Sequence, residues 1–155
     1  MKITDALRGE HGVLYVLFED VRETINDSDN IEVIRKSIST LDKALLSHAG
    51  IEDSILFPAL DQHIAGMGPL EMMRAEHQEV DELVAAARVE QDMATLKSQA
   101  KQLIDLAFGH FQKEEMALFA MAEQFLSEEE LAALGEQWAA KRNVTVEGHS
   151  CISAA

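Results

Sequence analysis

Residues 48–52 read His-Ala-Gly-Ile-Glu and residues 110–114 read His-Phe-Gln-Lys-Glu, so a histidine is followed four residues later by a glutamate in both stretches. The sequence around both stretches has helical periodicity, and an i, i+4 spacing places the two polar groups of each pair on one helix face, about one turn apart. Such an imidazole and carboxylate can bind one metal ion, while the second carboxylate oxygen can reach a neighbouring ion. The two stretches therefore predict paired metal-ligating positions on two helices.

Long amphipathic helices surround both stretches. Apolar residues recur at alternating three- and four-residue steps, which is the spacing of helices that pack in a bundle core. The pattern, the caps and the breaks predict helices over residues 3–26, 31–62, 69–89, 92–124 and 127–141. Pro58 lies inside the second helix and predicts a local kink near its last turns. Ser127 followed by Glu130 is a capping-box pattern, which predicts the start of the short fifth helix.

These helices predict an all-α fold, namely an up-down-up-down four-helix bundle with a short additional C-terminal helix. At 155 residues the chain is long enough for one compact domain with a sizeable core. We expect this domain to span residues 1–142, with the bundle core at residues 3–125. Residues 143–155 lack helical periodicity and are expected to form an irregular C-terminal tail.

The apolar positions of each long helix form a stripe along it, which we call its seam. Polar residues interrupt each seam. The seam of the second helix is expected to end at His48, Glu52, Ile55 and Ala59, and that of the fourth helix at His110, Glu114, Ala117 and Met121. Over all four helices, the polar seam residues are His11, His48, Glu52, His77, His110 and Glu114. A neighbouring carbonyl can satisfy a single buried histidine, but an unpaired ionised carboxylate in a core is very costly. Six such residues on four helices predict a shared metal site.

The polar seam residues also repeat. The first two helices supply the lone His11 and then the His48/Glu52 pair, and the next two supply the lone His77 and a second pair. Each helical hairpin thus provides half of a site for two metal ions, with the glutamates as bridges and the lone histidines as terminal ligands. This imidazole-rich set suits iron, zinc, copper or nickel better than magnesium or calcium. Two divalent ions exceed the charge of two carboxylates, which favours a bridging hydroxide or a small anionic or oxygen-derived ligand.

A family resemblance rests on four stretches. They are Glu10-His11, His48-x-x-x-Glu52 continuing to Leu56-Phe57-Pro58, Glu76-His77, and His110-Phe111-x-Lys113-Glu114-Glu115. Over about residues 3–125 the chain resembles the hemerythrin-like HHE cation-binding family. The resemblance implies a bundle that holds a non-haem di-iron centre, with two Fe ions and a bridging oxo or hydroxo group. Members of that family bind dioxygen, sense oxygen or iron, or handle nitric oxide and iron damage.

The chain departs from the dioxygen-carrying hemerythrins at two places. Those carriers have a fifth histidine on the third helix at an i, i+4 spacing, whereas here Met73 precedes His77 by four residues and Asp81 follows it by four. The position of this fifth histidine is left to a water, to Asp81 or to an exogenous ligand. The carriers also use an aspartate five residues after the fourth-helix histidine, where this chain has Glu115. We favour Glu114, because residues 53 and 115 are rotated about 100° away from the seam.

Several other polar residues were weighed as candidates. Tyr15 lies one turn beyond His11, either at the edge of the core or close to the metals. His63 borders a glycine-rich break and is expected to be exposed to solvent. His149 and Cys151 fall in the C-terminal tail. Cys151 is the only cysteine of the chain, so a disulfide within the chain is excluded.

Composition bounds the class of protein. The formal net charge of −15 argues against binding to a phosphate backbone and predicts no nucleic-acid partner. No apolar run reaches the roughly 18 residues of a membrane span, and no secretory signal is recognised. We therefore expect a cytoplasmic protein without a membrane partner.

Three functions were compared. The first is a di-iron protein that binds or senses dioxygen or a related diatomic or peroxide ligand, and we favour such a binding protein over an enzyme. The alternative is a di-iron oxidoreductase acting on peroxide or nitric oxide, or an iron storage or repair protein. A metal-free helical interaction module is disfavoured by the six polar seam residues. Other divalent metals remain candidates for the same ligands.

Overall fold

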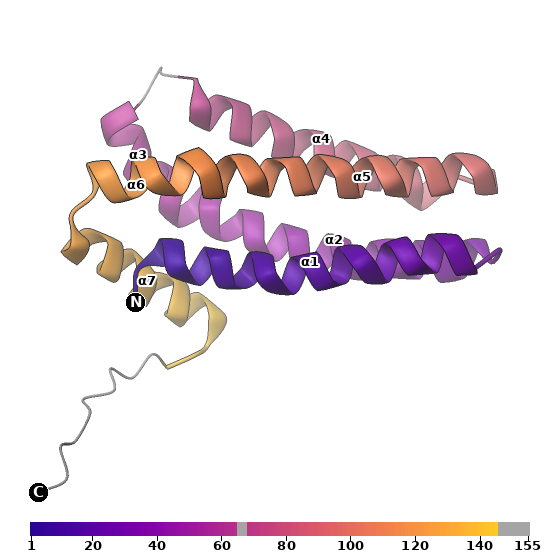
Figure 1. The fold of residues 1–155 in the computed structure, drawn as a ribbon, viewed down its shortest axis with the longest axis horizontal. Helices are drawn as coiled ribbons and strands as arrows, with labels where there is room; N and C mark the ends of the chain where they lie inside the picture. The colour runs from indigo at the N-terminus through magenta and orange to yellow at the C-terminus, as the bar shows by residue number, and fades with distance from the viewer. Residues whose placement is uncertain (65–67, 146–155) are drawn as a thin grey trace, which may run out of the picture.

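The protein is an all-helical bundle in a computed structural model that describes residues 1–64 and 68–145 (Figure 1). The elements are α1 (Ile3–Asp27), α2 (Ile31–Ile51), η1 (Glu52–Leu56), α3 (Phe57–Ile64), α4 (Pro69–Val89), α5 (Met93–Lys113), η2 (Glu114–Leu118), α6 (Phe119–Phe125) and α7 (Glu128–Arg142). The segments η1 and η2 are π-helical and continue α2 into α3 and α5 into α6. The expected four-helix bundle with an additional C-terminal helix is confirmed.

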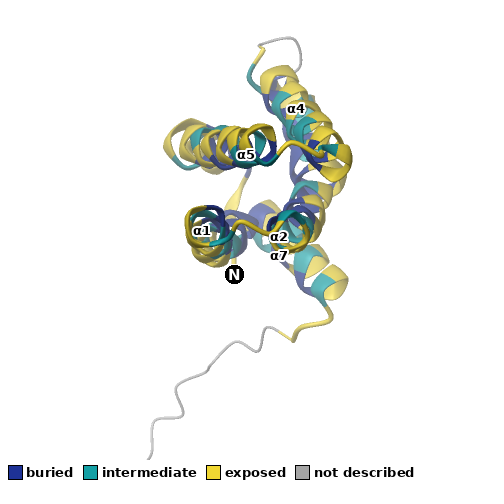
Figure 2. Ribbon diagram, turned by 90° about the vertical axis from the view of Figure 1, so that its right-hand side faces the viewer, coloured by how far each residue is buried: buried dark blue, intermediate teal, exposed yellow. Residues whose placement is uncertain are grey.

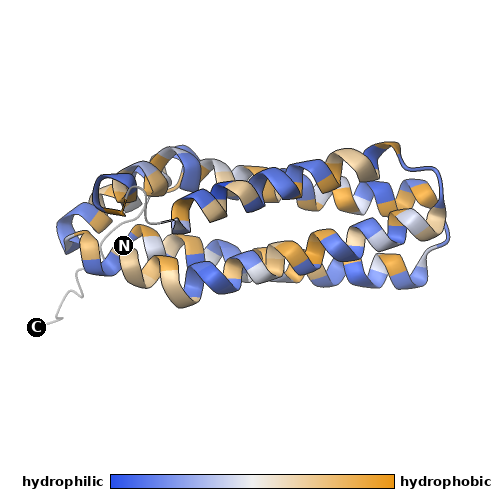
Figure 3. Ribbon diagram, turned by 90° about the horizontal axis from the view of Figure 1, so that it is seen from above, coloured by the Kyte–Doolittle hydropathy of each residue, from blue (hydrophilic) through white to orange (hydrophobic). Residues whose placement is uncertain are grey.

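Four long helical rods form the bundle. Seen end-on, α1 lies beside α2 and α5, while α4 lies beside α2 and α5 on the opposite corner (Figure 2). Each rod turns its buried face toward the bundle axis, and polar and apolar residues alternate along every rod (Figure 3). This amphipathic pattern is the one that the three- and four-residue spacing predicts.

Local signals set the ends of the helices. The Asn30 side chain accepts a hydrogen bond from the backbone N–H of Glu32 at 2.9 Å and so caps α2. The capping box of Ser127 and Glu130 is present at the start of α7, as predicted. Gly68 adopts a φ of +89° before α4, a conformation that favours glycine, and Pro69 follows in the first turn of the helix.

Two apolar clusters fill the bundle on either side of a polar layer. One cluster includes Leu14 and Phe18 of α1, and the other includes Leu7 of the same helix. His11 lies between them in sequence and is fully buried. The polar layer is therefore enclosed by apolar side chains along the bundle axis, which raises the cost of any uncompensated charge within it.

The expected seams are wrong at Ala59 and Ala117, although Ile55 is buried as expected. Ala59 is only partly buried and Ala117 is exposed, whereas Leu60 and Leu118 are buried. The cause is the π-helical turn that begins at each glutamate, because a π turn holds one more residue than an α turn and shifts the following buried positions by one. The observed seams therefore run through Leu56 and Leu60 in one rod and through Leu118 and Ala122 in the other.

Pro58 does not by itself explain the irregularity of its helix. The π turn Glu52–Leu56 ends before Pro58, which lies in the first turn of α3. The equivalent turn Glu114–Leu118 is followed by Ala120 at the position that matches Pro58. The irregularity near the proline is thus a π turn that occurs with and without proline, and the missing N–H of Pro58 is tolerated in the helix that follows.

A close backbone approach docks α7 against the start of the chain. A Cβ atom added at Gly135 would lie 2.2 Å from the carbonyl oxygen of Met1, so a side chain at this position would displace the N-terminus. Leu131 and Ala139 of α7 are buried nearby. The helix packs mainly against α1 and also contacts η1.

Candidate metal centre

The six polar seam residues meet in the layer between the two apolar clusters. Their ligand atoms fall into two groups of four, and the atoms of each group lie within 4.8 Å of one another. The first group, which we call the first half-site, consists of His11, His48, Glu52 and Glu114. The second half-site consists of His77, His110 and the same two glutamates. The two half-sites therefore share both carboxylates.

Each glutamate places one oxygen in each half-site. Glu52 Oε1 lies 3.3 Å from His48 Nε2, and its Oε2 lies 3.4 Å from His77 Nε2. Glu114 repeats this arrangement, with Oε1 3.2 Å from His110 Nε2 and Oε2 3.2 Å from His11 Nε2. A carboxylate whose oxygens face different ligand groups has the geometry of a bridge between two ions.

The histidines also turn their inner nitrogens toward one another. The Nε2 atoms of His11 and His48 are 3.1 Å apart, and those of His77 and His110 are 3.0 Å apart. Each half-site thus has two converging imidazole nitrogens, which are common ligands of transition metals.

The hydrogen bonding of the two glutamates supports a metal at this place. Both side chains are fully buried, and none of their four oxygens has a hydrogen-bond partner within the described part of the chain. Burying a carboxylate without partners costs several kcal/mol, so an additional cation is needed to compensate these oxygens. Four imidazole and four carboxylate donor atoms fit a pair of transition-metal ions better than magnesium or calcium.

Two outer carboxylates bind the far nitrogens of the paired histidines. His48 Nδ1 donates to Glu10 Oε2 at 2.8 Å, and His110 Nδ1 donates to Glu76 Oε2 at 2.9 Å. Glu10 and Glu76 occupy equivalent positions, each directly before the lone histidine of its hairpin. Such contacts fix the ring orientation, leave Nε2 free for a metal and raise its basicity.

The lone histidines bind carboxylates from the opposite hairpin. His11 Nδ1 lies 2.7 Å from Glu115 Oε1, and His77 Nδ1 lies 3.4 Å from Asp53 Oδ1. As expected, neither Asp53 nor Glu115 belongs to a ligand group, but each contacts the outer nitrogen of a lone histidine. Sequence analysis missed the roles of all four outer carboxylates. The signal that could have found them is the repeat of an acidic residue before each lone histidine and after each seam glutamate.

Hydrogen bonding and charge shift the acid–base behaviour of the site. Burial works against protonation of His48, but the charge of Glu52 and the hydrogen bond to Glu10 raise its pKa to about 10. The pKa of His110 is raised to about 8, against the effect of burial, by Glu114, Glu52 and Glu76. Burial also opposes ionisation of Glu52, yet His48 and His77 hold its pKa well below the usual range. Protons on the imidazoles thus occupy the place where cations would bind.

Tyr15 belongs to the outer shell of the first half-site. Its hydroxyl donates to Glu115 Oε1 at 3.1 Å, and the same carboxylate oxygen binds His11. Burial and the charge of Glu115 raise the pKa of Tyr15 to about 12. The tyrosine is thus a neutral hydrogen-bond donor to Glu115.

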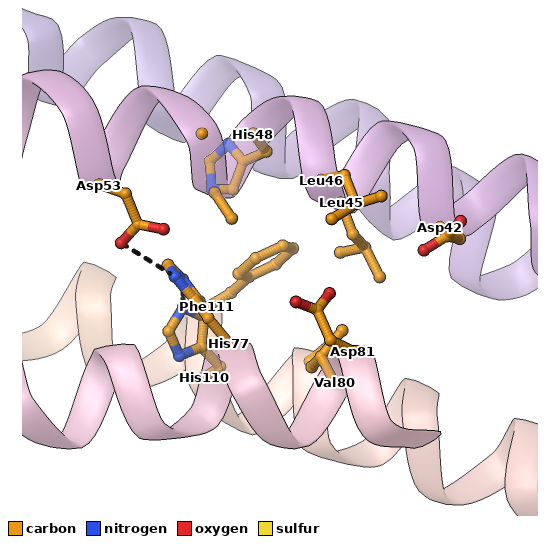
Figure 4. Close-up of a pocket in the computed structure, with 13 residues that line it drawn as sticks. Asp42, Leu45, Leu46, His48, Asp53, His77, Val80, Asp81, His110 and Phe111 are labelled. Atoms are coloured by element: carbon orange, nitrogen blue, oxygen red, sulfur yellow. Dashed lines mark hydrogen bonds and ion pairs between the residues drawn. The ribbon is translucent and has the colours of Figure 1, made fainter. Parts of the chain in front are cut away.

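A pocket of about 200 Å³ adjoins the site between α2 and α4. His48, His77 and His110 form part of its wall (Figure 4). Asp81 is exposed and directs its carboxylate into this space, but it is not a member of either ligand group. Met73 lies buried in an apolar cluster.

The remaining candidates lie away from this centre. His63 is exposed, as expected, and stacks on Phe125 with ring centroids 6.1 Å apart. His149 and Cys151 fall outside the residues that the structure describes. Over those described ranges, no helix is long and apolar enough to span a membrane.

Comparison with known proteins identifies one family. Residues 2–122 match the family described as the hemerythrin HHE cation binding domain. A protein named DNA nickase, from Nostoc sp. (strain PCC 7120), is 27% identical over 140 residues, which cover 90% of this chain and 37% of that protein. The chain thus spans little more than a third of the length of this relative. No solved structure matches the chain significantly.

Proposed function

This chain belongs to the hemerythrin HHE cation-binding domain family. We propose that it holds two iron ions through its six polar seam residues. We further propose that this centre binds or senses dioxygen or a related small molecule. The ligands would be His11, His48, His77 and His110 as imidazole donors, with Glu52 and Glu114 as bridging carboxylates. When bound, two iron ions supply reversible redox chemistry toward a small ligand.

The observation that carries this proposal is the arrangement of the four glutamate oxygens. All four are buried without hydrogen-bond partners among the described residues, and each faces a different histidine. Hydrogen bonds within the protein leave this charge uncompensated, whereas two cations between the half-sites would compensate it. Iron is favoured among the metals that suit these donors because of the family to which the chain belongs.

The protein's own residues would control the access of the small ligand. The pocket between α2 and α4 reaches His77 and His110, and its volume of about 200 Å³ accommodates a diatomic molecule or peroxide. We propose that this ligand approaches the second half-site, because both of its histidines line the pocket whereas only His48 of the first half-site does. Asp53 and Asp81 line the approach and can accept hydrogen bonds from a protonated ligand or water.

An oxidoreductase that acts on peroxide or nitric oxide is the second candidate. The chain of hydrogen bonds from Tyr15 through Glu115 to His11 favours it, because it connects a histidine of the site to a half-buried hydroxyl. The name of the relative suggests activity on DNA for that longer protein. The net charge of −15 opposes binding to a phosphate backbone.

The proposal is tested by metal analysis and absorption spectroscopy. Protein loaded anaerobically with Fe²⁺ should contain about two iron ions per chain, and its absorption spectrum should change on exposure to air. Fewer than one iron per chain would exclude the dinuclear site. Two iron ions without a spectral response to oxygen, peroxide or nitric oxide would exclude the small-molecule function but leave the metal site standing.

A further inference from the structure

Helix α7 reaches the metal centre although it lies beyond the residues 2–122 that match the family. The Trp138 indole donates to Glu10 Oε1 at 2.6 Å. The Arg142 guanidinium donates to both oxygens of the same carboxylate, at 2.6 Å from Nε and 2.9 Å from Nη2. Glu10 in turn accepts from His48 Nδ1. Two side chains of α7 therefore hold the outer partner of a histidine in the first half-site.

Arg142 also fixes the helix that carries this histidine. Its Nη1 donates to Ser47 Oγ at 2.6 Å, and its Nη2 donates to the Ser47 carbonyl at 2.9 Å. Ser47 directly precedes His48 in α2. A planar guanidinium with several fixed donors thus joins α7, α1 and α2 at one point, which restricts both the backbone and the ring orientation of His48.

The second half-site has weaker support at the equivalent positions. Glu76 there is bound by Lys113, a flexible side chain that is 44% exposed. Asp53 is 48% exposed and lies 3.4 Å from His77, whereas Glu115 lies 2.7 Å from His11 and is also bound by Tyr15. Within the described chain, the helix packed on Glu10 has no counterpart at Glu76. The two half-sites repeat in their ligands but differ in their outer support.

We propose that α7 acts on metal retention, with Trp138 and Arg142 as positioning residues that orient His48 through Glu10. The first half-site then releases its ion more slowly than the second half-site, both of whose histidines line the pocket. This inference rests on the proposed two-metal function. Loss of an outer partner of a metal-bound histidine typically weakens metal affinity by roughly 10- to 100-fold.

The test uses Co²⁺, which absorbs visible light when bound and binds to imidazole and carboxylate ligands. Wild-type protein loaded with Co²⁺ is mixed with excess chelator, and the loss of absorbance is followed over time. We expect two phases of about equal amplitude. Trp138 is the only tryptophan, so its fluorescence reports on Glu10 and is expected to follow the slow phase alone.

Substitutions assign the two phases. Trp138→Phe and Arg142→Gln should accelerate the slow phase by about 10-fold or more and leave the fast phase unchanged. Arg142→Lys, which keeps the charge, should restore part of the retention. Lys113→Gln should accelerate only the fast phase. Lys141→Gln is the matched control, because it removes the contact of α7 with Ser54 at 2.6 Å without touching Glu10, and both phases should persist.

Three results would overturn the inference. The first is a single phase in the wild type, and the second is a slow phase that both Trp138→Phe and Arg142→Gln leave unchanged. The third is a slow phase that Lys141→Gln accelerates as much as these two substitutions do. Circular dichroism verifies folding, and if Arg142→Gln does not fold, Trp138→Phe decides. Binding of fewer than one Co²⁺ by the wild type would contradict the two-metal function as well, whereas the three results above would leave that function intact.

Discussion

Glu52 and Glu114 are each placed between two histidines of different hairpins, and this shared position makes the two half-sites interdependent. Each carboxylate lies 3.2–3.4 Å from two imidazole nitrogens that belong to separate ligand groups. Loss of one carboxylate would remove a ligand from both groups and leave both ions with less charge compensation in a poorly solvated core. At the residue scale, substitution of a bridging carboxylate is therefore expected to abolish metal binding, whereas substitution of an outer carboxylate is expected only to weaken it.

Substitution of one bridging glutamate should abolish binding of both ions. Glu114→Gln keeps the shape of the side chain but removes its charge, so iron content should fall from about two per chain to near zero rather than to one. The matched control is Glu115→Gln, which removes the partner of His11 Nδ1 and should weaken binding by roughly 10- to 100-fold without abolishing it. Iron analysis after anaerobic loading measures both. Retention of iron by Glu114→Gln together with its loss from Glu115→Gln would show that the longer spacing of the oxygen carriers applies.

Metal binding should release protons and strengthen with rising pH. The pKa of His110 is raised to about 8 and that of His48 to about 10 in the metal-free protein, so both are protonated at neutral pH and must lose a proton to bind a metal. Zn²⁺ affinity, measured by competition with a chromophoric chelator of known pH dependence, should increase between pH 6.5 and 9. An affinity that is flat over this range would contradict protonated histidines in the metal-free state.

The same groups predict the opposite trend for the stability of the metal-free protein. A histidine whose folded pKa is raised contributes stability that is fully present below its unfolded pKa of about 6.5. That contribution is lost as the pH rises through the folded pKa, which is about 8 for His110. The free energy of unfolding of the metal-free protein should therefore fall from pH 7 to 9, as measured by denaturant titration.

At the scale of elements, each π turn adds one residue to its rod where the bridging glutamate is placed. Both turns begin at a proposed bridging carboxylate, at Glu52 and at Glu114. π turns are often found at functional sites, where they change the direction of a side chain without ending the helix. Each π turn contains one additional residue. If that residue were removed, the buried positions before and after the turn would follow the three- and four-residue spacing of one continuous α-helix.

Deletion of Ser54 should accordingly preserve the bundle and weaken metal binding. The exposed Ser54 lies in η1, and its removal would convert the π turn into an α turn while Leu56 and Leu60 continue to face the core. Deletion of the exposed Thr40 from the regular helix α2 is the control, since it shifts every following seam residue by about 100°. Circular dichroism and thermal unfolding should show a folded first variant and a severely destabilised second one. Equal destabilisation of the two would contradict this role of the π turn.

At the scale of the whole molecule, the polar layer links metal content to folding. The two apolar clusters lie on either side of the six polar seam residues, so in the metal-free bundle only imidazole protons balance the two buried carboxylates at its centre. Ions that bind only to the folded state stabilise it by mass action, by about 2.7 kcal/mol when the free ion exceeds the dissociation constant 100-fold.

Removal of metal should therefore lower the thermal midpoint. A loss of that size corresponds to roughly 5 °C or more for a domain of this length. Calorimetry of metal-loaded and chelator-treated protein measures the difference. Glu52→Gln serves as the control, since its midpoint should no longer respond to metal. A wild-type protein with the same midpoint in both states would show that the polar layer is compensated without metal.

The sequence determined much of this protein through local periodicity. Helix positions, caps and the six polar seam residues follow from spacings of three and four residues, because an α-helix places such residues on one face. The same reasoning failed just after Glu52 and Glu114. An additional residue in one turn leaves no local mark in a periodic pattern, so Ala59 and Ala117 were assigned to the core in place of Leu60 and Leu118.

Only the tertiary structure decided which outer groups support which histidine. Glu115 and His11 are 104 residues apart in the sequence, and Arg142 and Glu10 are 132 residues apart. No local spacing predicts such pairs, because they depend on how the rods pack and on where α7 returns to the bundle. The sequence thus determined which six polar residues line the seams through helical geometry, whereas the packing of distant helices decided their orientation and the difference between the two half-sites.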